Sequence, residues 1–302
     1  HYSYDSVRGT DKRLQQNISN AEDTTDSTWF NSFNSNGFTI GSEANINNSS
    51  STYASWNWKA GTAFSNDASA TGVGSIDSAG SINTTAGFSI IGWTGTNANG
   101  TIAHGLGAVP KMIIIRRRPS SSTWVVYHEA NGNTGRLALD ETSAFNANST
   151  FFNNTSPTST TFSVGTDGGS NGSTDTYIAY CFAEKKGYCK FESYVGNSST
   201  DGPFIHTNFK PAFLIIKAIA SSDNWTMYDN KRPSYNSGNY FLFPNLSNAE
   251  DTSNSTWIDI LSNGFKVRAT SSTLNTSGNT YIYMAFAENP FVTSTGIPTT
   301  AR

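Results

Sequence analysis

The segment YIAYCFAE at residues 177–184 decides the fold, because variants of it occur at two other places in the chain. It returns as YIYMAFAE at residues 281–288 and, more loosely, as YASWNWKA at residues 53–60. The two closer copies are eight residues long and rich in aromatic and β-branched residues, which is typical of a β-strand. The recurrence predicts a protein built from repeats of one β-rich unit.

Other matches keep a constant spacing. Trp124 and Tyr127 return 101 positions later as Trp225 and Tyr228. Residues 17–38 match residues 245–265 more closely than any part of the middle of the chain, at an offset of about 228 positions. The first residues of the sequence correspond to the interior of the last unit, so we expect the first unit to be truncated.

These spacings predict five parts. They are a truncated N-terminal repeat unit at 1–60, a Ser/Thr/Gly-rich linker or inserted hairpin at 61–85, complete repeat units at 86–187 and 188–290, and a C-terminal tail at 291–302.

The strand pattern predicts an all-β fold. Apolar segments of four to eight residues, bounded by Gly, Asn, Ser or Pro, recur about seven times in each complete unit, and no segment has the pattern of a crossover helix. We therefore expect stacked tandem modules of the antiparallel β-sandwich or jelly-roll type. The helix signal is the Ser-x-x-Glu capping box at 19–22 and again at 247–250, which predicts a single turn at most.

The composition limits the partners. Ser, Thr and Asn account for 42, 37 and 33 of the 302 residues, while 39 aromatic residues are enough to build a core and argue against disorder. The net charge of -3, without a basic stripe, predicts no nucleic-acid partner. The longest apolar runs have about five residues, so we expect no segment inserted in a membrane.

Two Trp and Tyr pairs are the candidate ligand-binding residues. The rings of Trp124, Tyr127, Trp225 and Tyr228 could stack on the apolar faces of sugars. Residues at i and i+3 of a strand point to opposite sides, and the pairs recur in both complete units. Core packing is therefore the alternative interpretation.

Cys181 and Cys189 flank EKKG, which is typical of a hairpin turn. A register centred on Lys185 would place the two cysteines opposite each other and allow a disulfide, whereas a slip of one residue would place them on opposite faces. Free buried thiols are the alternative.

Catalytic and metal patterns are weak. His104, just before a strand that opens at Pro110, fits a structural role better than that of a general base, and Asp140 and Glu141 are adjacent and would point apart on a strand. We therefore expect no enzyme and no cofactor. The loop at 166–175, TDGGSNGSTD, could supply oxygen ligands to Ca²⁺, but turn formation is the simpler interpretation.

Six asparagines are among the Asn-x-Ser/Thr sequons, which become glycosylation sites only if the host glycosylates asparagine. They are Asn17, Asn83, Asn154, Asn224, Asn245 and Asn275.

The ordered motifs SNAED, SNGF, GFSIIGWTGT, HGLGAVPKMIIIRR, TYIAYCFAE, KFESYVGN, DGPFIHTNFKPAFLIIK, AFAENPF and GIPTTAR cover nearly the whole chain. In this order the chain resembles a repeated domain of unknown function found in structural proteins of marine bacteriophages and cyanophages. The resemblance implies a β-rich virion component, often a tail fibre or appendage with a lectin-like module, and no catalytic residues.

We therefore expect a virion structural protein on the virion surface, in a tail fibre, spike or other appendage. Its expected partners are other virion proteins, copies of itself in a homo-oligomer and host surface polysaccharide. Two alternatives stay open. One is a cellular extracellular adhesin or glycosylated surface-fibre subunit, and the other is a secreted polysaccharide-degrading enzyme.

Overall fold

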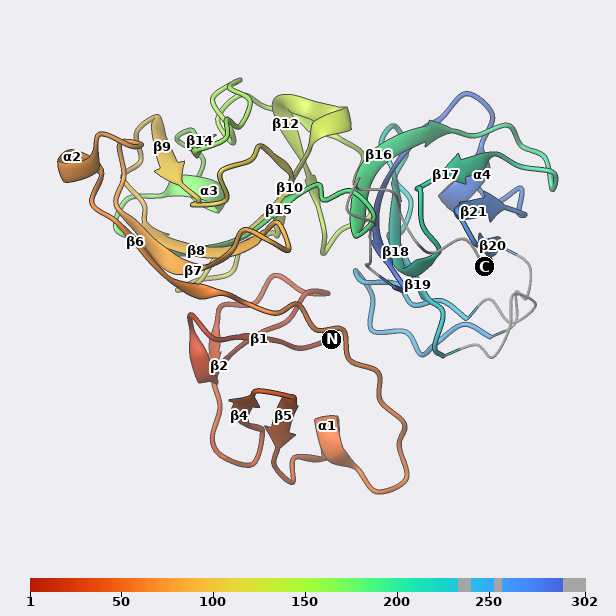
Figure 1. The fold of residues 1–302 in the computed structure, drawn as a ribbon, viewed down its shortest axis with the longest axis horizontal. Coiled ribbons are helices and arrows are strands. Elements are labelled where there is room, and N and C mark those ends of the chain that lie inside the picture. The colour runs from red at the N-terminus through yellow and green to blue at the C-terminus, as the bar shows by residue number, and fades with distance from the viewer. Residues whose placement is uncertain (233–239, 253–256, 290–302) are drawn as a thin grey trace.

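The computed structural model describes residues 1–232, 240–252 and 257–289, and the predicted tail at 291–302 lies outside them. Antiparallel sheets of short strands dominate the described chain, which confirms the predicted all-β class. Figure 1 shows three lobes around a common centre, which correspond to the three repeat units.

The last unit consists of two sheets that enclose a core. Its elements are β16 (Cys189–Val195), β17 (Phe204–His206), β18 (Pro211–Ala218), β19 (Thr226–Asp229), β20 (Ile258–Leu261), β21 (Gly264–Val267), the one-turn helix α4 (Ser272–Asn275) and β22 (Thr280–Ala287). The larger sheet has the order β16-β22-β18-β19 and the smaller sheet the order β17-β21-β20. Tyr194, Leu214 and Tyr281 of the larger sheet share one apolar cluster with Ile205 and Phe265 of the smaller one.

The middle unit repeats this plan. Its elements are β8 (Phe88–Thr94), β9 (Gly100–Ala103), β10 (Pro110–Arg117), β11 (Val125–His128), the 3-10 helix η1 (Glu129–Asn131), β12 (Gly132–Ala138), β13 (Asn146–Ala147), β14 (Thr161–Val164), α3 (Gly168–Asn171) and β15 (Thr176–Ala183). The stretch at 61–85 contains the hairpin of β6 (Thr62–Asn66) and β7 (Ser78–Asn83), with α2 (Ala68–Thr71) between them. Because β7 pairs with β8, this hairpin extends the larger sheet to eight strands, in the order β13-β12-β11-β10-β15-β8-β7-β6.

The first unit has only part of the plan. Its elements are β1 (Ser3–Asp5), β2 (Gly9–Leu14), β3 (Asp23–Thr24), β4 (Phe30–Asn34), β5 (Gly37–Ile40) and α1 (Ala44–Asn47). Residues 53–60 are the counterpart of β22, yet they do not form a strand. The physical reason is that β22 is held between β16 and β18, and residues 1–60 contain no equivalents of those two strands.

The larger sheets are buried on both faces. Along β15, Tyr177, Ala179 and Cys181 face the core of the middle unit, whereas Ile178 and Phe182 face a second core. The second core also contains side chains of the first and last units, including Leu14, Trp225 and Phe286, with Trp58 packed against it. All three units therefore share one apolar centre.

Equivalent residues meet at this centre. Trp58, Phe182 and Phe286 occupy the same position in the three copies of the decisive segment. Their ring centroids lie 6.2 Å apart for Trp58 and Phe182, 5.5 Å for Trp58 and Phe286, and 6.1 Å for Phe182 and Phe286. Each aromatic contact of this kind contributes about 0.5–1.5 kcal/mol beyond the apolar area that it buries. The three units are thus arranged around an aromatic triangle.

Equivalent contacts join neighbouring units. The indole Nε1 of Trp124 donates to the carbonyl of Gln15 at 2.9 Å, and that of Trp225 donates to the carbonyl of Ala138 at 2.7 Å. Gln15 and Ala138 are equivalent, since each directly follows an Arg-Leu pair. The first unit is thereby joined to the middle unit in the same way as the middle unit is joined to the last.

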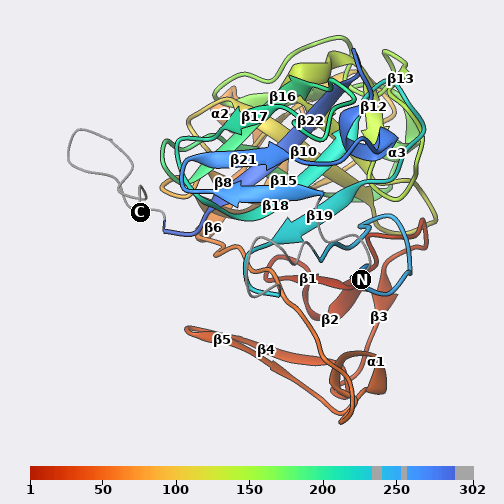
Figure 2. The same ribbon diagram turned by 90° about the vertical axis from the view of Figure 1, so that its right-hand side faces the viewer.

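A third contact brings the last unit back to the first. The guanidinium of Arg232 lies 5.6 Å from the ring centre of Trp56, and the ring of Phe213 lies 5.9 Å from that of Trp56. The units therefore close around their centre, whereas the expected stacked modules would stand in a row. Figure 2 shows the first unit below the other two units, which overlap in this direction.

The capping-box segments at 19–22 and 247–250 form no helical turn, which is within the prediction of one turn at most. Residues 19–22 do not form a helix, because their polar groups bind other segments. The carboxylate of Glu22 accepts hydrogen bonds from Nε and Nη2 of Arg118 at 2.9 and 2.8 Å, and Nη1 of Arg8 lies 3.2 Å from it. The motif therefore serves the junction between the first and middle units.

Candidate functional site

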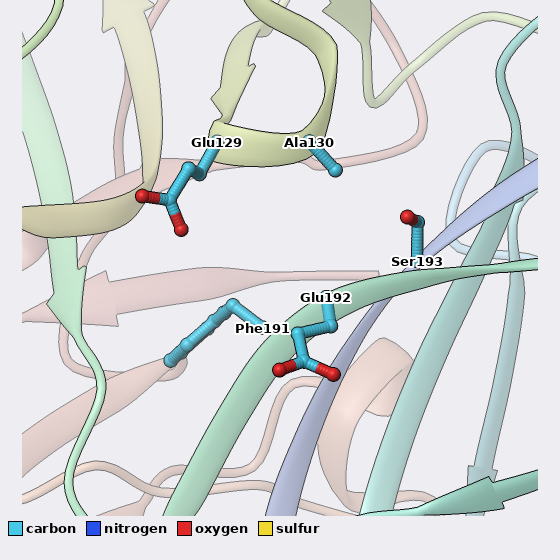
Figure 3. Close-up of a pocket in the computed structure, with 5 residues that line it drawn as sticks. All are labelled: Glu129, Ala130, Phe191, Glu192 and Ser193. Atoms are coloured by element: carbon cyan, nitrogen blue, oxygen red, sulfur yellow. The ribbon is translucent and has the colours of Figure 1, made fainter.

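An open pocket lies at the junction between the middle and last units. Its volume is about 250 Å³, and it is lined by Glu129, Ala130, Phe191, Glu192 and Ser193. Figure 3 shows Glu129 and Ala130 entering from η1, opposite the three residues of β16. The pocket exists only because the two repeat units pack against each other.

His128 positions the η1 side of this pocket. Its Nδ1 accepts a hydrogen bond from the backbone N–H of Ala130 at 3.2 Å, and its Nε2 lies 3.2 Å from the carbonyl of Tyr283 in the last unit. These two partners fit the neutral imidazole with the proton on Nε2. Burial lowers the pKa of His128 to about 4. The imidazole therefore links the two units as an uncharged group.

The two carboxylates of the pocket are paired with lysines. Lys111 binds Glu129, and Nζ of Lys190 lies 3.2 Å from a carboxylate oxygen of Glu192. Burial raises the pKa of the adjacent Glu184, and the charge of Glu192 adds to this rise. Paired carboxylates in an open pocket can accept hydrogen bonds from the hydroxyl groups of a ligand such as a sugar.

The aromatic residues predicted to bind glycans do not face solvent. Trp124, Tyr127, Trp225 and Tyr228 have between 1% and 4% of their surface exposed. The two tryptophans belong to the shared centre, and the two tyrosines belong to the cores of their own units. The prediction that these rings stack on sugars is wrong, and the alternative of core packing describes them correctly.

The two cysteines are free thiols, so the predicted disulfide is absent. Cys189 pairs with Lys185 across the turn and lies in the shared centre, while Cys181 lies in the core of the middle unit. The expected hairpin is absent, because β15, which holds Cys181, pairs with β10 and β8, whereas β16, which holds Cys189, pairs with β22 in another sheet. Burial raises the pKa of both thiols to about 12, which leaves them protonated.

Two of the six sequon asparagines are buried. Asn245 donates to Asn224, and Asn275 donates to the carbonyls of Ser199 and Ala269, so neither side chain can carry a glycan in the folded protein. Asn154 is exposed, and Asn17, Asn83 and Asn224 are partly exposed.

The candidate catalytic and calcium residues have structural partners. Asp140 accepts hydrogen bonds from the backbone N–H of Trp124 at 2.8 Å and from the hydroxyl of Thr123 at 2.7 Å. His104 lies 3.2 Å from the carbonyl of Thr158, as expected for a structural histidine. In the loop at 166–175, an aspartate caps α3 and another pairs with an arginine.

Sequence reasoning missed the pocket. Glu129 and Glu192 belong to different units and to no repeated motif, so no sequence pattern connected them.

Within residues 1–232, 240–252 and 257–289, no group of three or more His, Cys, Asp or Glu residues could hold a metal ion. No helix in this same part of the chain is long and apolar enough to cross a membrane.

The fold and the junction define an all-β protein whose internal repeats surround a shared core. A family model described as a domain of unknown function, DUF7483, matches residues 1–290. The chain belongs to this family. Comparisons with curated proteins and with solved structures gave no match.

Proposed function

We propose that this chain is a structural subunit of a bacteriophage virion, located on the virion surface in a tail fibre, spike or other appendage. The observation that carries the proposal is the closed arrangement of three repeat units around Trp58, Phe182 and Phe286. Units that share one core resist local opening, which suits a particle that must persist outside a cell. The order of the sequence motifs, similar to that of phage structural proteins, supports the same function.

The proposed ligand is host surface polysaccharide. The pocket with Glu129 and Glu192 offers acceptors for sugar hydroxyls. Other virion proteins and further copies of this chain are the proposed protein partners. An arrangement of three similar units could sit on the axis of a trimeric appendage.

Mass spectrometry of purified virions tests the virion assignment. We expect the chain in a fixed ratio to the tail proteins, and labelled antibodies should bind at an appendage in electron micrographs. Absence from purified particles would overturn the assignment. Recovery from the host envelope instead would favour a cellular adhesin.

A polysaccharide array tests the ligand. Binding should weaken at least tenfold when Glu129→Gln and Glu192→Gln are combined, because both amides lose acceptor capacity and charge. Asp11→Asn, a change of an exposed carboxylate outside the pocket, serves as the control and should bind as the unmodified protein does. Equal binding by the double variant would reject this pocket, and shortening of the polysaccharide would favour an enzyme.

A further inference from the structure

His128 occupies a position that holds an aspartate in the other two units. Asp5 of the first unit and Asp229 of the last unit each follow a tyrosine, as His128 does, and all three side chains are buried. Each side chain accepts a hydrogen bond from the backbone N–H two residues later. The three residues therefore cap the same turn, but an imidazole has its ordinary pKa near neutral pH and an aspartate does not.

The two aspartates have an arginine partner that the middle unit lacks. Nε of Arg8 lies 2.6 Å from Oδ2 of Asp5, and Nε of Arg232 lies 2.6 Å from Oδ2 of Asp229. Burial raises the pKa of Asp229, but hydrogen bonds from Arg232 outweigh it and lower the pKa below the ordinary value. The middle unit has Asn131 at the position of the arginine, so this turn holds no ion pair.

The contact between this turn and the neighbouring unit differs among the three junctions. In the first unit, the aspartate accepts a hydrogen bond from the hydroxyl of Tyr180 in the middle unit at 2.7 Å. In the last unit, Arg232 lies against the ring of Trp56 in the first unit. In the middle unit, Nε2 of His128 lies 3.2 Å from the carbonyl of Tyr283 in the last unit. One imidazole thus caps η1 and also contacts the last unit.

Protonation of this imidazole disturbs the turn that it caps. The neutral ring accepts the backbone N–H of Ala130 at Nδ1, 3.2 Å away. A protonated ring carries an N–H at both nitrogens, so Nδ1 would face a second donor and could no longer accept. The charge would also be buried without a carboxylate bound to the ring, which is costly. Protonation therefore favours a conformation in which His128 reaches water.

The charged groups of the middle unit leave this preference in place. Burial lowers the pKa of His128 to about 4, while the charge of Glu129 raises it and that of Lys111 lowers it. Glu129 and Lys111 also bind each other. The closed junction keeps the ring neutral down to about pH 4, whereas an opened junction with a pKa of about 6.5 takes up the proton first. Closure is therefore most favourable above pH 6.5 and loses stability as the pH falls.

The groups that face this junction from the other side act differently. The hydroxyl of Tyr283 lies 3.4 Å from Glu192, which pairs with Lys190. Burial raises the pKa of Glu184, the residue after β15, and the charge of Glu192 adds to this rise. The closed junction therefore takes up the proton of Glu184 first, so this carboxylate favours closure in acid. Glu184 limits the acid response that His128 drives.

We propose that protonation of His128 releases η1 from β16 and opens the junction between the middle and last units, while the other two junctions stay closed. The opening separates Glu129 from Glu192 and removes the pocket between them, whether or not this pocket binds a polysaccharide. It also uncovers the part of the shared apolar centre that β16 contributes, with Phe191 and Cys189. The closed arrangement of three units thus has one acid-sensitive junction.

The two buried thiols can report the opening. Cys189 lies in the shared centre, whereas Cys181 lies in the core of the middle unit. The reaction of each thiol with 4,4′-dithiodipyridine is followed in the full chain at pH 7 and pH 5, relative to N-acetylcysteine at the same pH. Cys181→Ala and Cys189→Ala assign the two rates. We expect the relative rate of Cys189 to rise roughly twentyfold at pH 5, because the opened junction gains a proton, and that of Cys181 to stay unchanged.

Histidine variants locate the switch. His128→Gln cannot be protonated in this range, so it should lose the rise in the rate of Cys189. His206→Gln, a change of an exposed histidine on β17, is the matched control and should keep the rise. Circular dichroism at pH 7 shows that each variant is folded.

Hydrogen exchange of the unmodified protein tests the same proposal without a variant. The amides of η1 and β16 should lose protection at pH 5, while those of β1 and β2 keep it. The proposal is overturned by a relative rate of Cys189 that does not change with pH or by the same rise in His128→Gln. Equal rises at Cys181 and Cys189, or equal loss of protection at β1 and β2, would overturn it as well, because they indicate unfolding of the whole chain.

Discussion

The first and last units have the most similar sequences in the molecule and the most different surroundings. Residues 17–38 and 245–265 share most of their positions, yet Phe38 is exposed and Phe265 is buried. The difference arises from β16, β17 and β18, which the last unit has and the first unit lacks. Burial of a residue is thus decided by strands distant in the chain, even where the local sequence is the same.

Local hydrogen bonding is the same in both units. Tyr53 and Tyr281 each bind the one-turn helix that precedes them, at equivalent backbone atoms. These bonds join groups five to nine residues apart, so the local sequence supplies both partners of each bond. The comparison separates what a local sequence determines from what long-range packing adds.

The largest expected effect is that of truncating the equivalent tyrosines. Tyr281→Ala should lower the free energy of unfolding by about 4 kcal/mol, because it empties a buried site. Tyr53→Ala should lower it by about 1 kcal/mol or less, because its ring is half exposed. Urea denaturation of both variants provides the measurement, and equal losses would show that the two units do not differ in packing.

Acid should weaken the junction of the middle and last units. The pKa of His128 is about 4 in the folded protein and about 6.5 when unfolded, so the unfolded state takes up the proton first. The free energy of unfolding that neutral His128 contributes above pH 6.5 should therefore fall by about 3 kcal/mol as the pH is lowered to 4. Asp5 of the first unit and Asp229 of the last unit occupy the position equivalent to His128, so this histidine is specific to the middle unit.

Urea denaturation between pH 7 and pH 4 measures this loss. The side chain of the variant His128→Gln cannot be protonated in this range, so its free energy of unfolding should fall by about 3 kcal/mol less than that of the unmodified protein between pH 7 and pH 4. An equal fall in the variant and in the unmodified protein would contradict a neutral buried histidine.

Substitution of the asparagine that ends the one-turn helix should also lower the free energy of unfolding more in the last unit than in the first. Asn275→Ala should cost about 2 kcal/mol, because its removal leaves buried backbone groups without partners. Asn47→Ala should cost under about 1 kcal/mol, since its side chain is exposed. Thermal unfolding of the two variants measures both losses in stability. A larger loss for Asn47→Ala than for Asn275→Ala would contradict the difference in burial between the two units.

The smallest effect concerns the thiols. Cys181→Ala introduces the residue that the last unit has at the equivalent position, Ala285, and should cost about 1 kcal/mol or less. Dithiothreitol should leave the midpoint of thermal unfolding unchanged, because the two thiols lie in different cores. A lower midpoint on reduction would reveal a disulfide.

The sequence predicted the strands and the repeats, because turn residues and constant spacings mark them directly. It did not predict that Ile178 and Phe182 face a second core, since the partners of these residues lie in other units. One sign was present. The run YIAYCFAE has no alternation of apolar and polar residues, which is typical of a strand buried on both faces.

The site residues were harder to predict. Glu129 and Glu192 come together only through the packing of two units, which no local pattern records. The sequence predicts a sequon at Asn275, but the equivalence of Asn275 with Asn47 at a spacing of 228 indicates a structural role. A polar residue that recurs at equivalent positions of two units in this chain therefore indicates a shared structural role rather than a ligand site.

A double-mutant cycle between Trp58 and Phe286 tests most directly whether the three units share one centre. The free energy of unfolding is measured for Trp58→Ala, for Phe286→Ala and for the combined variant. A coupling of about 1 kcal/mol is expected, because the two rings are 5.5 Å apart although 228 positions separate them. Strictly additive effects would mean that the first and last units do not meet, as in a row of independent modules.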